Sequence, residues 1–165
     1  MTPALKTFII YSSSDRDLRT ALERQLKSLI DNGLIKLWSD KEILPGEQWD
    51  STIKKQLLQA ELFLMLISAD FFNSDYIREK EFAAALAKLE RGEAIIIPII
   101  VRDCDWEAYP EIQKLQVLPP GGKPITDLRH WGTSDSAWAT VTRKIRSLIE
   151  IRRSEQAEQK RLQLL

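Results

Sequence analysis

Short apolar runs rich in β-branched and aromatic residues alternate along this chain with stretches of helical periodicity. The runs lie at Thr7–Tyr11, Leu34–Trp38, Leu62–Ile67 and Ala94–Val101. Between them, apolar residues recur every three or four positions, as on the buried face of an amphipathic helix. Strands that alternate with helices form a parallel sheet covered by helices on both faces. A shorter run at Pro124–Leu128 makes five strands the simplest count for this α/β fold.

This pattern also predicts where a ligand would bind. A flavodoxin-like strand order is the simplest for such a chain, and ligands of these sheets bind outside the carboxyl ends of the strands. The segments expected on that rim are Tyr11–Asp15, Ser39–Trp49 and Ser68–Asp75. In the fourth run Pro98 lacks an amide donor, which favours an edge strand or a bulge at that point.

Length and charge narrow the function classes. The chain has 165 residues, which suits one domain. We expect this domain to span residues 1–151, with residues 152–165 as a charged helical extension or linker. Twenty-four basic residues balance twenty-four acidic ones, which argues against nucleic acid or a membrane surface as a partner. No apolar run approaches the ~20 residues of a membrane helix, and the N-terminal residues lack a signal-peptide pattern, so a cytoplasmic location is expected.

Few residues suit metal or nucleophilic chemistry. The single cysteine, Cys104, and the single histidine, His130, exclude a disulfide framework and a histidine-rich metal site. Cys104 lies beside two aspartates, which disfavour a thiolate. His130 precedes a tryptophan, and packing or surface exposure is its expected role. We therefore predict no metal site.

The helix expected around Phe82 carries two acidic candidates, Glu79 and Glu81. They differ by about 200° around a helix axis, so only one of them can face the rim. A charged first turn that complements the helix dipole explains the same residues, and the pattern alone favours that explanation without excluding a site. Trp49 is similarly open, because its ring suits either the core or the face of a bound nucleobase.

Three groups of motifs resemble a TIR (Toll/interleukin-1 receptor) domain of the bacterial type over residues 6 to 150. The motifs are FIIYSSSD at 8–15, LWSD at 37–40 with ILPGE at 43–47, and LISADFF at 66–72 with SDY at 74–76 and Glu81. Residues 129–131 with Trp138 are similar to a third, weaker box. The TIR fold is a flavodoxin-like five-stranded parallel sheet, in agreement with the strand pattern.

The resemblance implies an activity. Many TIR domains cleave NAD⁺ between nicotinamide and ribose, giving ADP-ribose or a cyclic isomer, and Glu81 falls at the position of their essential glutamate. Four residues earlier, Ile77 stands where relatives frequently have Trp or Cys. NAD⁺ would be a substrate, with no further cofactor. The residues that the resemblance implies around the nucleotide are Tyr11, Ser12, Ser13, Asp40, Trp49 and Ile77.

The resemblance also implies partners. Residues Ser39 to Gln48 would form the loop that TIR domains use to bind one another, so we expect a homo-oligomer when active, in bacterial immune signalling such as antiviral defence. Some relatives have basic residues where Ser12 and Ser13 stand here. A non-catalytic TIR–TIR interaction module is the alternative function.

The chemistry needs few groups. The nicotinamide–ribose bond breaks with release of a neutral ring, so no acid is required. The difficulty is an oxocarbenium-like transition state, which one carboxylate near the ribose can stabilise. A carboxylate, an aromatic face and a rim of hydroxyls are sufficient in principle, with no metal.

Overall fold

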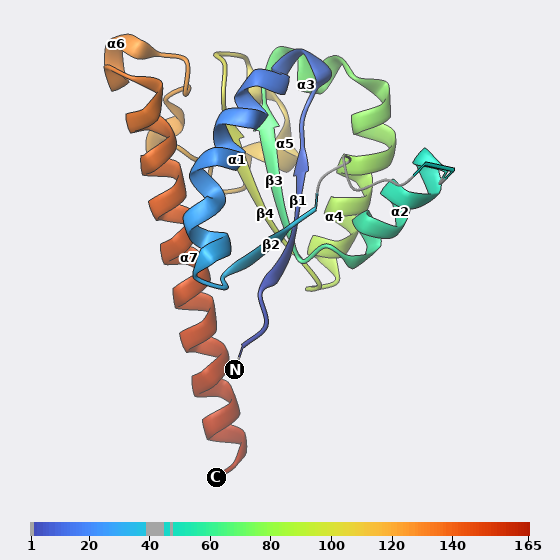
Figure 1. Cartoon of the computed structure of the whole chain (residues 1–165), viewed down its shortest axis with the longest axis vertical. Coiled ribbons are helices and arrows are strands. Elements are labelled where there is room, and N and C mark those ends of the chain that lie inside the picture. The colour runs from blue at the N-terminus through green and yellow to red at the C-terminus, as the bar shows by residue number, and fades with distance from the viewer. Residues whose placement is uncertain (1, 39–44, 47) are drawn as a thin grey trace.

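The computed structural model describes residues 2–38, 45–46 and 48–165. They form an α/β fold in which a parallel sheet lies between two layers of helices (Figure 1). The sheet has four strands in the order β2-β1-β3-β4, as in the flavodoxin-like prediction. The strands are β1 (Leu5–Ile10), β2 (Ile35–Leu37), β3 (Leu62–Ile67) and β4 (Ile95–Ile100).

Helices connect and cover the strands. The longer ones are α1 (Arg16–Asp31), α2 (Trp49–Gln59), α4 (Ala83–Glu90) and α7 (Ser134–Gln163). Short helices are α3 (Ala69–Asn73), α5 (Pro110–Gln113) and α6 (Leu128–Trp131). Single turns are η1 (Ser13–Asp15), η4 (Trp106–Ala108) and η5 (Pro120–Gly122), and η3 (Ile77–Phe82) is a π-helical segment that leads into α4.

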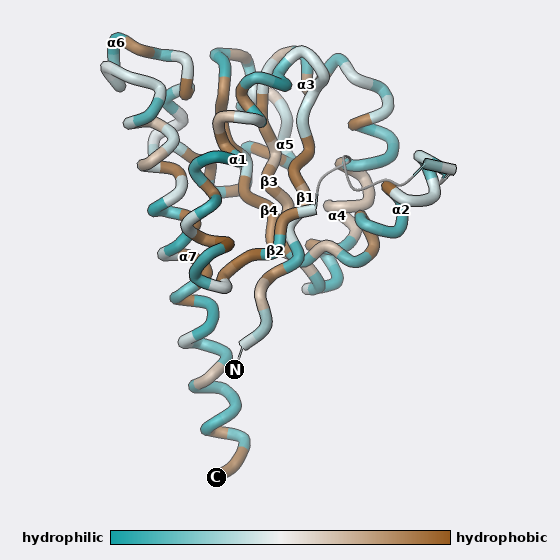
Figure 2. Tube along the Cα trace, in the orientation of Figure 1, coloured by the Kyte–Doolittle hydropathy of each residue, from teal (hydrophilic) through white to brown (hydrophobic). Residues whose placement is uncertain are grey.

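The central strand β3 supplies both halves of the core. Every residue of β3 is buried, and its side chains alternate between the two faces of the sheet. Leu62, Leu64 and Leu66 pack with α1 and α7 on one face. Phe63 and Met65 pack with α2, α3 and α4 on the other. Figure 2 shows the strands as the most hydrophobic part of the chain, inside more hydrophilic helices.

The predicted fifth strand at Pro124–Leu128 does not form. Within the described residues, Ile125 and Thr126 donate backbone hydrogen bonds to the carbonyls of Ile100 and Val101, at 3.0 and 3.1 Å. The chain then turns, because the amide of Asp127 bonds back to the carbonyl of Pro124. Asp127 also caps α6 with its side chain. Two backbone hydrogen bonds therefore fasten this segment to the last residue of β4 and the residue after it, without extending the sheet.

The edge position expected from Pro98 is confirmed. β4 is the last strand of the sheet, and Pro98 lies in register with Met65 of β3. The carbonyl of Pro98 accepts a hydrogen bond from the amide of Leu118 at 2.8 Å. Irregular chain thus covers an edge that would otherwise present unpaired backbone groups.

The C-terminal helix α7 continues without a break from Ser134 to Gln163 and extends beyond the sheet (Figure 1). Arg153 fixes its middle to the body of the fold by donating to the carbonyls of Pro3 and Gly33. The turns after Arg153 are exposed and mostly hydrophilic (Figure 2). Within the described residues, no helix combines the length and apolar character needed to cross a membrane.

Truncating the centre of β3 should destabilise the fold strongly. Leu64 is fully buried, so Leu64→Ala removes packed methyl groups and leaves a cavity, and we expect a loss of about 2–5 kcal/mol in the free energy of unfolding. Urea denaturation measures the change. Leu58→Ala is the matched control, because Leu58 is 63% exposed and should lose less than ~1 kcal/mol. Equal losses in both variants would contradict this description of the core.

Candidate active site

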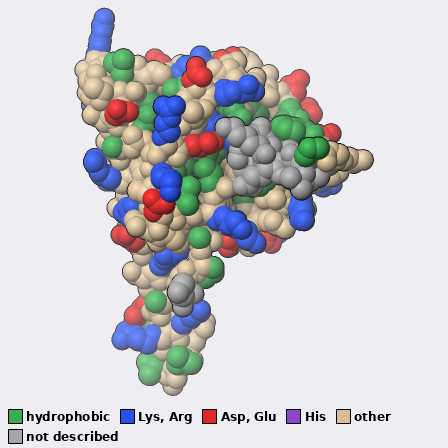
Figure 3. All heavy atoms as spheres, in the orientation of Figure 1, with side chains coloured by type: hydrophobic (Ala, Val, Ile, Leu, Met, Phe, Trp, Pro, Cys, Tyr) green, Lys and Arg blue, Asp and Glu red, His purple; other side chains and the backbone are tan. Residues whose placement is uncertain are grey.

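A cavity of about 550 Å³ opens beyond the carboxyl ends of β1 and β2. Its volume lies within the range of roughly 300–1,000 Å³ that small-molecule sites occupy. In the view of Figure 1, basic, acidic and hydrophobic side chains are interspersed over the surface (Figure 3). The lining residues include six of the seven predicted site residues, namely Tyr11, Ser12, Ser13, Trp49, Ile77 and Glu81. The seventh, Asp40, lies outside the described residues, as does most of the predicted loop Ser39–Gln48, of which Pro45 and Gly46 form the expected turn.

The turn after β1 presents hydroxyl groups to the cavity. Ser12 is buried, and its Oγ accepts a hydrogen bond from the amide of Ser14 at 3.2 Å. The carbonyl of Ser12 accepts from the amide of Asp15 at 2.8 Å, which closes η1. Ser13 is exposed at the start of η1 and lines the cavity. Serine is common at such positions because its hydroxyl satisfies a free amide at the start of a helix.

Two arginines of α1, which the sequence reasoning missed, line the same cavity. Arg19 donates to the hydroxyl of Tyr11 at 2.9 Å, and its guanidinium lies over the Tyr11 ring, 4.8 Å from the centroid. It also forms an ion pair with Glu23 at 2.6 Å. Arg16 is exposed, one turn earlier on the same helix. The first turn of α1 therefore supplies the positive charge that Ser12 and Ser13 lack. Arg16 follows Ser13 by three residues, and this spacing was the signal in the sequence that could have identified it.

The opposite wall is the helical segment that carries Glu81. Ser74 starts it, since its Oγ accepts from the amide of Ile77 at 3.2 Å. From Ile77 to Phe82 the chain forms a π-helix, a winding often found at functional sites. Ile77 and Phe82 are buried, and Glu81 is half-buried on the cavity side.

Glu79 and Glu81 point to different sides, as their spacing predicts. Glu79 is exposed and contributes to hollows other than this cavity. Glu81 lines the cavity beside Tyr76 and Ile77. The alternative of an exposed, charged first turn therefore describes Glu79 and not Glu81.

The carboxyl group of Glu81 is desolvated. Burial raises the pKa of Glu81 from 4.5 to about 7. Glu81 forms no ion pair and no hydrogen bond through its carboxyl with any of residues 2–38, 45–46 or 48–165. A buried carboxyl without a counter-charge opposes folding, and such groups are concentrated at functional sites.

Aromatic side chains line the same cavity as Glu81. Trp49, at the start of α2, is 51% exposed, and Tyr76 is 41% exposed. Trp38 stacks on Phe8 with a centroid separation of 5.4 Å and an interplanar angle of 10°. Burial, followed by the charges of Glu81 and Asp50, raises the pKa of Tyr76, so its phenol stays neutral. Trp38 and Tyr76 were not predicted at the site.

The remaining reactive side chains lie elsewhere. Burial, with a smaller effect from Asp103, raises the pKa of the Cys104 thiol, in keeping with the expectation that it is not a nucleophile. His130 is exposed and contacts the Trp131 ring edge-on, with 4.7 Å between centroids.

The fold and the cavity define a flavodoxin-like α/β protein with a cavity at the carboxyl edge of its sheet. The family model for the TIR domain matches residues 7–145, and the chain therefore belongs to the TIR domain family. The resemblance found in the sequence motifs is confirmed.

Individual relatives agree with this family. Protein y4lF of Sinorhizobium fredii (strain NBRC 101917 / NGR234) is 40% identical over 139 residues, which are 84% of this chain and 42% of that protein. The chain thus spans less than half the length of this relative. The TIR domain of the Toll-related receptor TRR-2 from Hydra magnipapillata has a TM-score of 0.54 and 21% identity, covering 85% of this chain and 97% of that one. The TIR domains of the activated Roq1 resistosome, which recognises the effector XopQ, have a TM-score of 0.51 and 16% identity, covering 85% and 84%. These two structures support the fold alone.

Replacing Glu81 by Gln should stabilise the protein at high pH. The pKa of Glu81 is higher in the folded chain than its ordinary value of 4.5, so the folded state binds more protons between about pH 4.5 and 7, and stability falls as pH rises through that window. Glu81→Gln removes this loss. We expect about 1–3 kcal/mol of added unfolding free energy at pH 8 and almost none at pH 4.

Denaturant unfolding at the two pH values measures this difference. Glu79→Gln is the matched control, since Glu79 is exposed and outside the cavity, and it should change stability by less than ~0.5 kcal/mol at either pH. A Glu81→Gln variant that is no more stable than the parent at pH 8 would show that the carboxyl is solvated or paired.

Proposed function

We propose that this TIR domain is an NAD⁺ nucleosidase with Glu81 as its catalytic residue. The observation that carries the proposal is a carboxyl group held half-buried in a nucleotide-sized cavity without a counter-charge among the described residues. In this cavity a cationic ligand would supply the missing charge. The sugar of NAD⁺ becomes cationic as the nicotinamide bond breaks.

The reaction balances without a metal or an added acid. The C1′–N bond breaks and its electron pair leaves with nicotinamide, which converts the pyridinium into a neutral ring. Water adds to C1′ and releases one proton, so that NAD⁺ and water give ADP-ribose, nicotinamide and H⁺. Attack by a group of the same nucleotide in place of water would give a cyclic isomer.

Glu81 would act in its ionised form. A carboxylate beside C1′ stabilises the developing oxocarbenium charge, and the effect is larger in a desolvated site than in water. Burial, which raises the pKa of Glu81, also leaves the carboxylate poorly hydrated before the substrate arrives. The group is thus prepared for a charge that develops only in the transition state.

Other lining residues suit the rest of the dinucleotide. Ser12 and Ser13 can donate hydroxyl hydrogen bonds, and Arg16 adds an exposed guanidinium that suits a phosphate oxygen. The rings of Trp49 and Tyr76 offer exposed faces for the nicotinamide or adenine base.

Self-assembly would control the activity. The loop Ser39–Gln48 leads directly into Trp49 at the cavity, so a second TIR domain bound through it would lie beside the site. The TIR domains of the activated Roq1 resistosome belong to an assembly. We infer a homo-oligomer that cleaves NAD⁺ in bacterial immune signalling, including antiviral defence.

The second candidate function is a non-catalytic TIR–TIR interaction module. It is favoured by an apolar hollow of about 510 Å³ between α2 and η3–α4, which is lined by the exposed side chain of Leu58 among others. Such a module has no use for a desolvated carboxyl at residue 81. Nicotinamide release therefore separates the two functions, whereas loss of assembly does not.

Glu81→Gln should abolish NAD⁺ cleavage. The amide keeps the shape of the side chain but carries no charge, so we expect nicotinamide release from NAD⁺ to fall by more than ~100-fold. Chromatography of the products from concentrated protein measures this. Glu79→Gln, two residues away on the exposed side, should retain the parental rate. Equal rates for Glu81→Gln and the parent would leave the interaction module as the function.

The pH dependence gives an independent test. Protonated Glu81 is neutral and cannot stabilise the ribosyl cation, so kcat/KM for NAD⁺ should rise with pH along a limb of pKa about 7 and level off near pH 8. The profile is recorded at one protein concentration so that assembly stays constant. A kcat/KM that is flat between pH 5.5 and 8.5 would mean that another group carries the reaction.

A further inference from the structure

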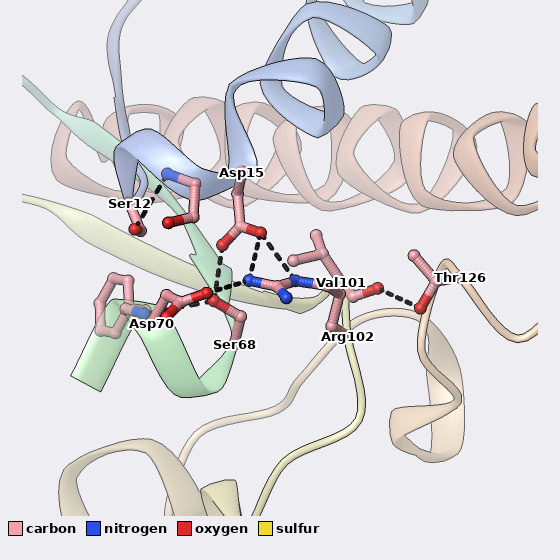
Figure 4. A network of polar contacts seen from close by, with 9 residues as sticks. Ser12, Asp15, Ser68, Asp70, Val101, Arg102 and Thr126 are labelled. Atoms are coloured by element: carbon pink, nitrogen blue, oxygen red, sulfur yellow. Dashed lines mark hydrogen bonds and ion pairs between the residues drawn. The ribbon is translucent and has the colours of Figure 1, made fainter. Parts of the chain in front are cut away.

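Arg102, two residues after the end of β4, bridges two carboxylates at the carboxyl edge of the sheet (Figure 4). Its Nε donates to Oδ1 of Asp15 at 2.8 Å, and its Nη2 donates to Oδ2 of Asp70 at 2.5 Å. The other oxygen of Asp15 accepts from the hydroxyl of Ser68 at 2.5 Å. Asp15 is 1% exposed, so these contacts supply the hydrogen bonds that a buried carboxylate requires. None of these four residues lines the cavity.

The contact between Arg102 and Asp15 supports the wall of the cavity that Ser12 and Ser13 form. Asp15 is the last residue of η1, the turn that begins with Ser13 and is capped by Ser12. Because η1 is only three residues long, the place of Asp15 fixes the place of both serines. Figure 4 shows Ser12 and Asp15 on the same turn, above the Arg102 side chain.

The contact between Arg102 and Asp70 supports the wall that carries Glu81. Ser68 caps α3, where its Oγ accepts from the amide of Phe71 at 3.2 Å, and Asp70 lies in the first turn of α3. The Phe71 ring packs against the Phe82 ring with 5.8 Å between centroids. Phe82 is the residue after Glu81 in the π-helical segment, so α3 supports that segment from behind.

Arg102 itself stands on rigid backbone. The amide of Val101 bonds to the carbonyl of Ile67 at 3.0 Å, which joins the ends of β4 and β3. The carbonyl of Val101 accepts from Oγ1 of Thr126 at 3.0 Å (Figure 4). The guanidinium thus extends from the fixed end of a strand to two elements that carry opposite walls of the cavity.

We propose that Arg102 is a positioning residue that sets the separation between the Ser12–Ser13 turn and Glu81. This inference rests on the proposed nucleosidase function for its effect on the reaction, although not for its effect on the structure. Catalysis is sensitive to such placement, since a shift of about 1 Å in a reacting group can slow a reaction ~100-fold.

Only the planar fork of arginine spans both carboxylates. Lysine keeps the charge but places it at a single atom, so Arg102→Lys should lose the simultaneous hydrogen bonds that hold Asp15 and Asp70 at a fixed separation. The charge of the buried Asp15 stays balanced, which favours folding of the variant. Asp70→Asn is a second and milder variant, because Asp70 is partly exposed and the change releases only α3.

The matched control is Arg153→Lys. Arg153 also ties distant segments together with one guanidinium, at the carbonyls of Pro3 and Gly33, but it lies on α7 away from the cavity. Both Arg→Lys variants should lower the melting temperature. Only Arg102→Lys should lower kcat/KM for NAD⁺, by more than ~10-fold when assayed at a temperature at which each variant is folded.

Hydrogen exchange of the full chain without NAD⁺ provides the readout that is independent of activity. In Arg102→Lys, amides of residues 12–15 and 70–82 should exchange faster, while those of residues 137–149 in α7 should not. The exchange measurement remains informative if the parent protein does not cleave NAD⁺. Failure of the proposed function and failure of this inference can therefore be distinguished.

Three results would overturn the inference. Exchange of both segments could remain at the parental rate in Arg102→Lys, which means that the arginine holds neither wall. Exchange could increase while kcat/KM stays parental, which means that the contacts serve stability alone. If Arg102→Lys does not fold, Asp70→Asn decides: unchanged exchange over residues 70–82 rejects the proposal, and faster exchange there with slower NAD⁺ cleavage supports it.

Discussion

A desolvated carboxyl group without a counter-charge destabilises the fold that contains it, and the cavity of this TIR domain holds a half-buried carboxyl that has no such partner within residues 2–38, 45–46 and 48–165. Glu81 is desolvated enough to raise its pKa to about 7, although charged side chains are plentiful elsewhere on the surface. Buried Asp15 differs, because Ser68 and Arg102 satisfy both of its oxygens. The same edge of the sheet thus holds one acidic group that is structurally satisfied and one that has no such partner among the described residues, and we propose the second for the reaction.

Much of the fold follows from local pattern. β3 has the predicted bounds, because six consecutive buried residues suit only a central parallel strand. The fifth strand at Pro124–Leu128 is absent because its residues also favour a turn, and the competing capping bonds of Asp127 end the pairing after two hydrogen bonds. The Ser68–Asp75 connection contains α3, since the Ser68 hydroxyl starts a helix that its aromatic residues gave no reason to expect.

The site was predictable where neighbours in sequence are neighbours in space. Ser12, Ser13 and Glu81, which the family resemblance implied, line one cavity, and the spacing of the two glutamates correctly indicated that only one faces it. Arg16 was missed because a charged residue at the start of a helix is ordinary. Arg102 was beyond reach, since its partner Asp15 is 87 residues away and only the parallel sheet brings them together.

The measurement that most directly tests the central claim is a ¹³C NMR titration of the Glu81 carboxyl, assigned by the signal that Glu81→Gln removes. We expect a midpoint near pH 7 in the free protein and a lower midpoint when a cationic, uncleavable NAD⁺ analogue is bound, because the positive ring favours the carboxylate. A midpoint near 4.5 that the analogue leaves unchanged would contradict it.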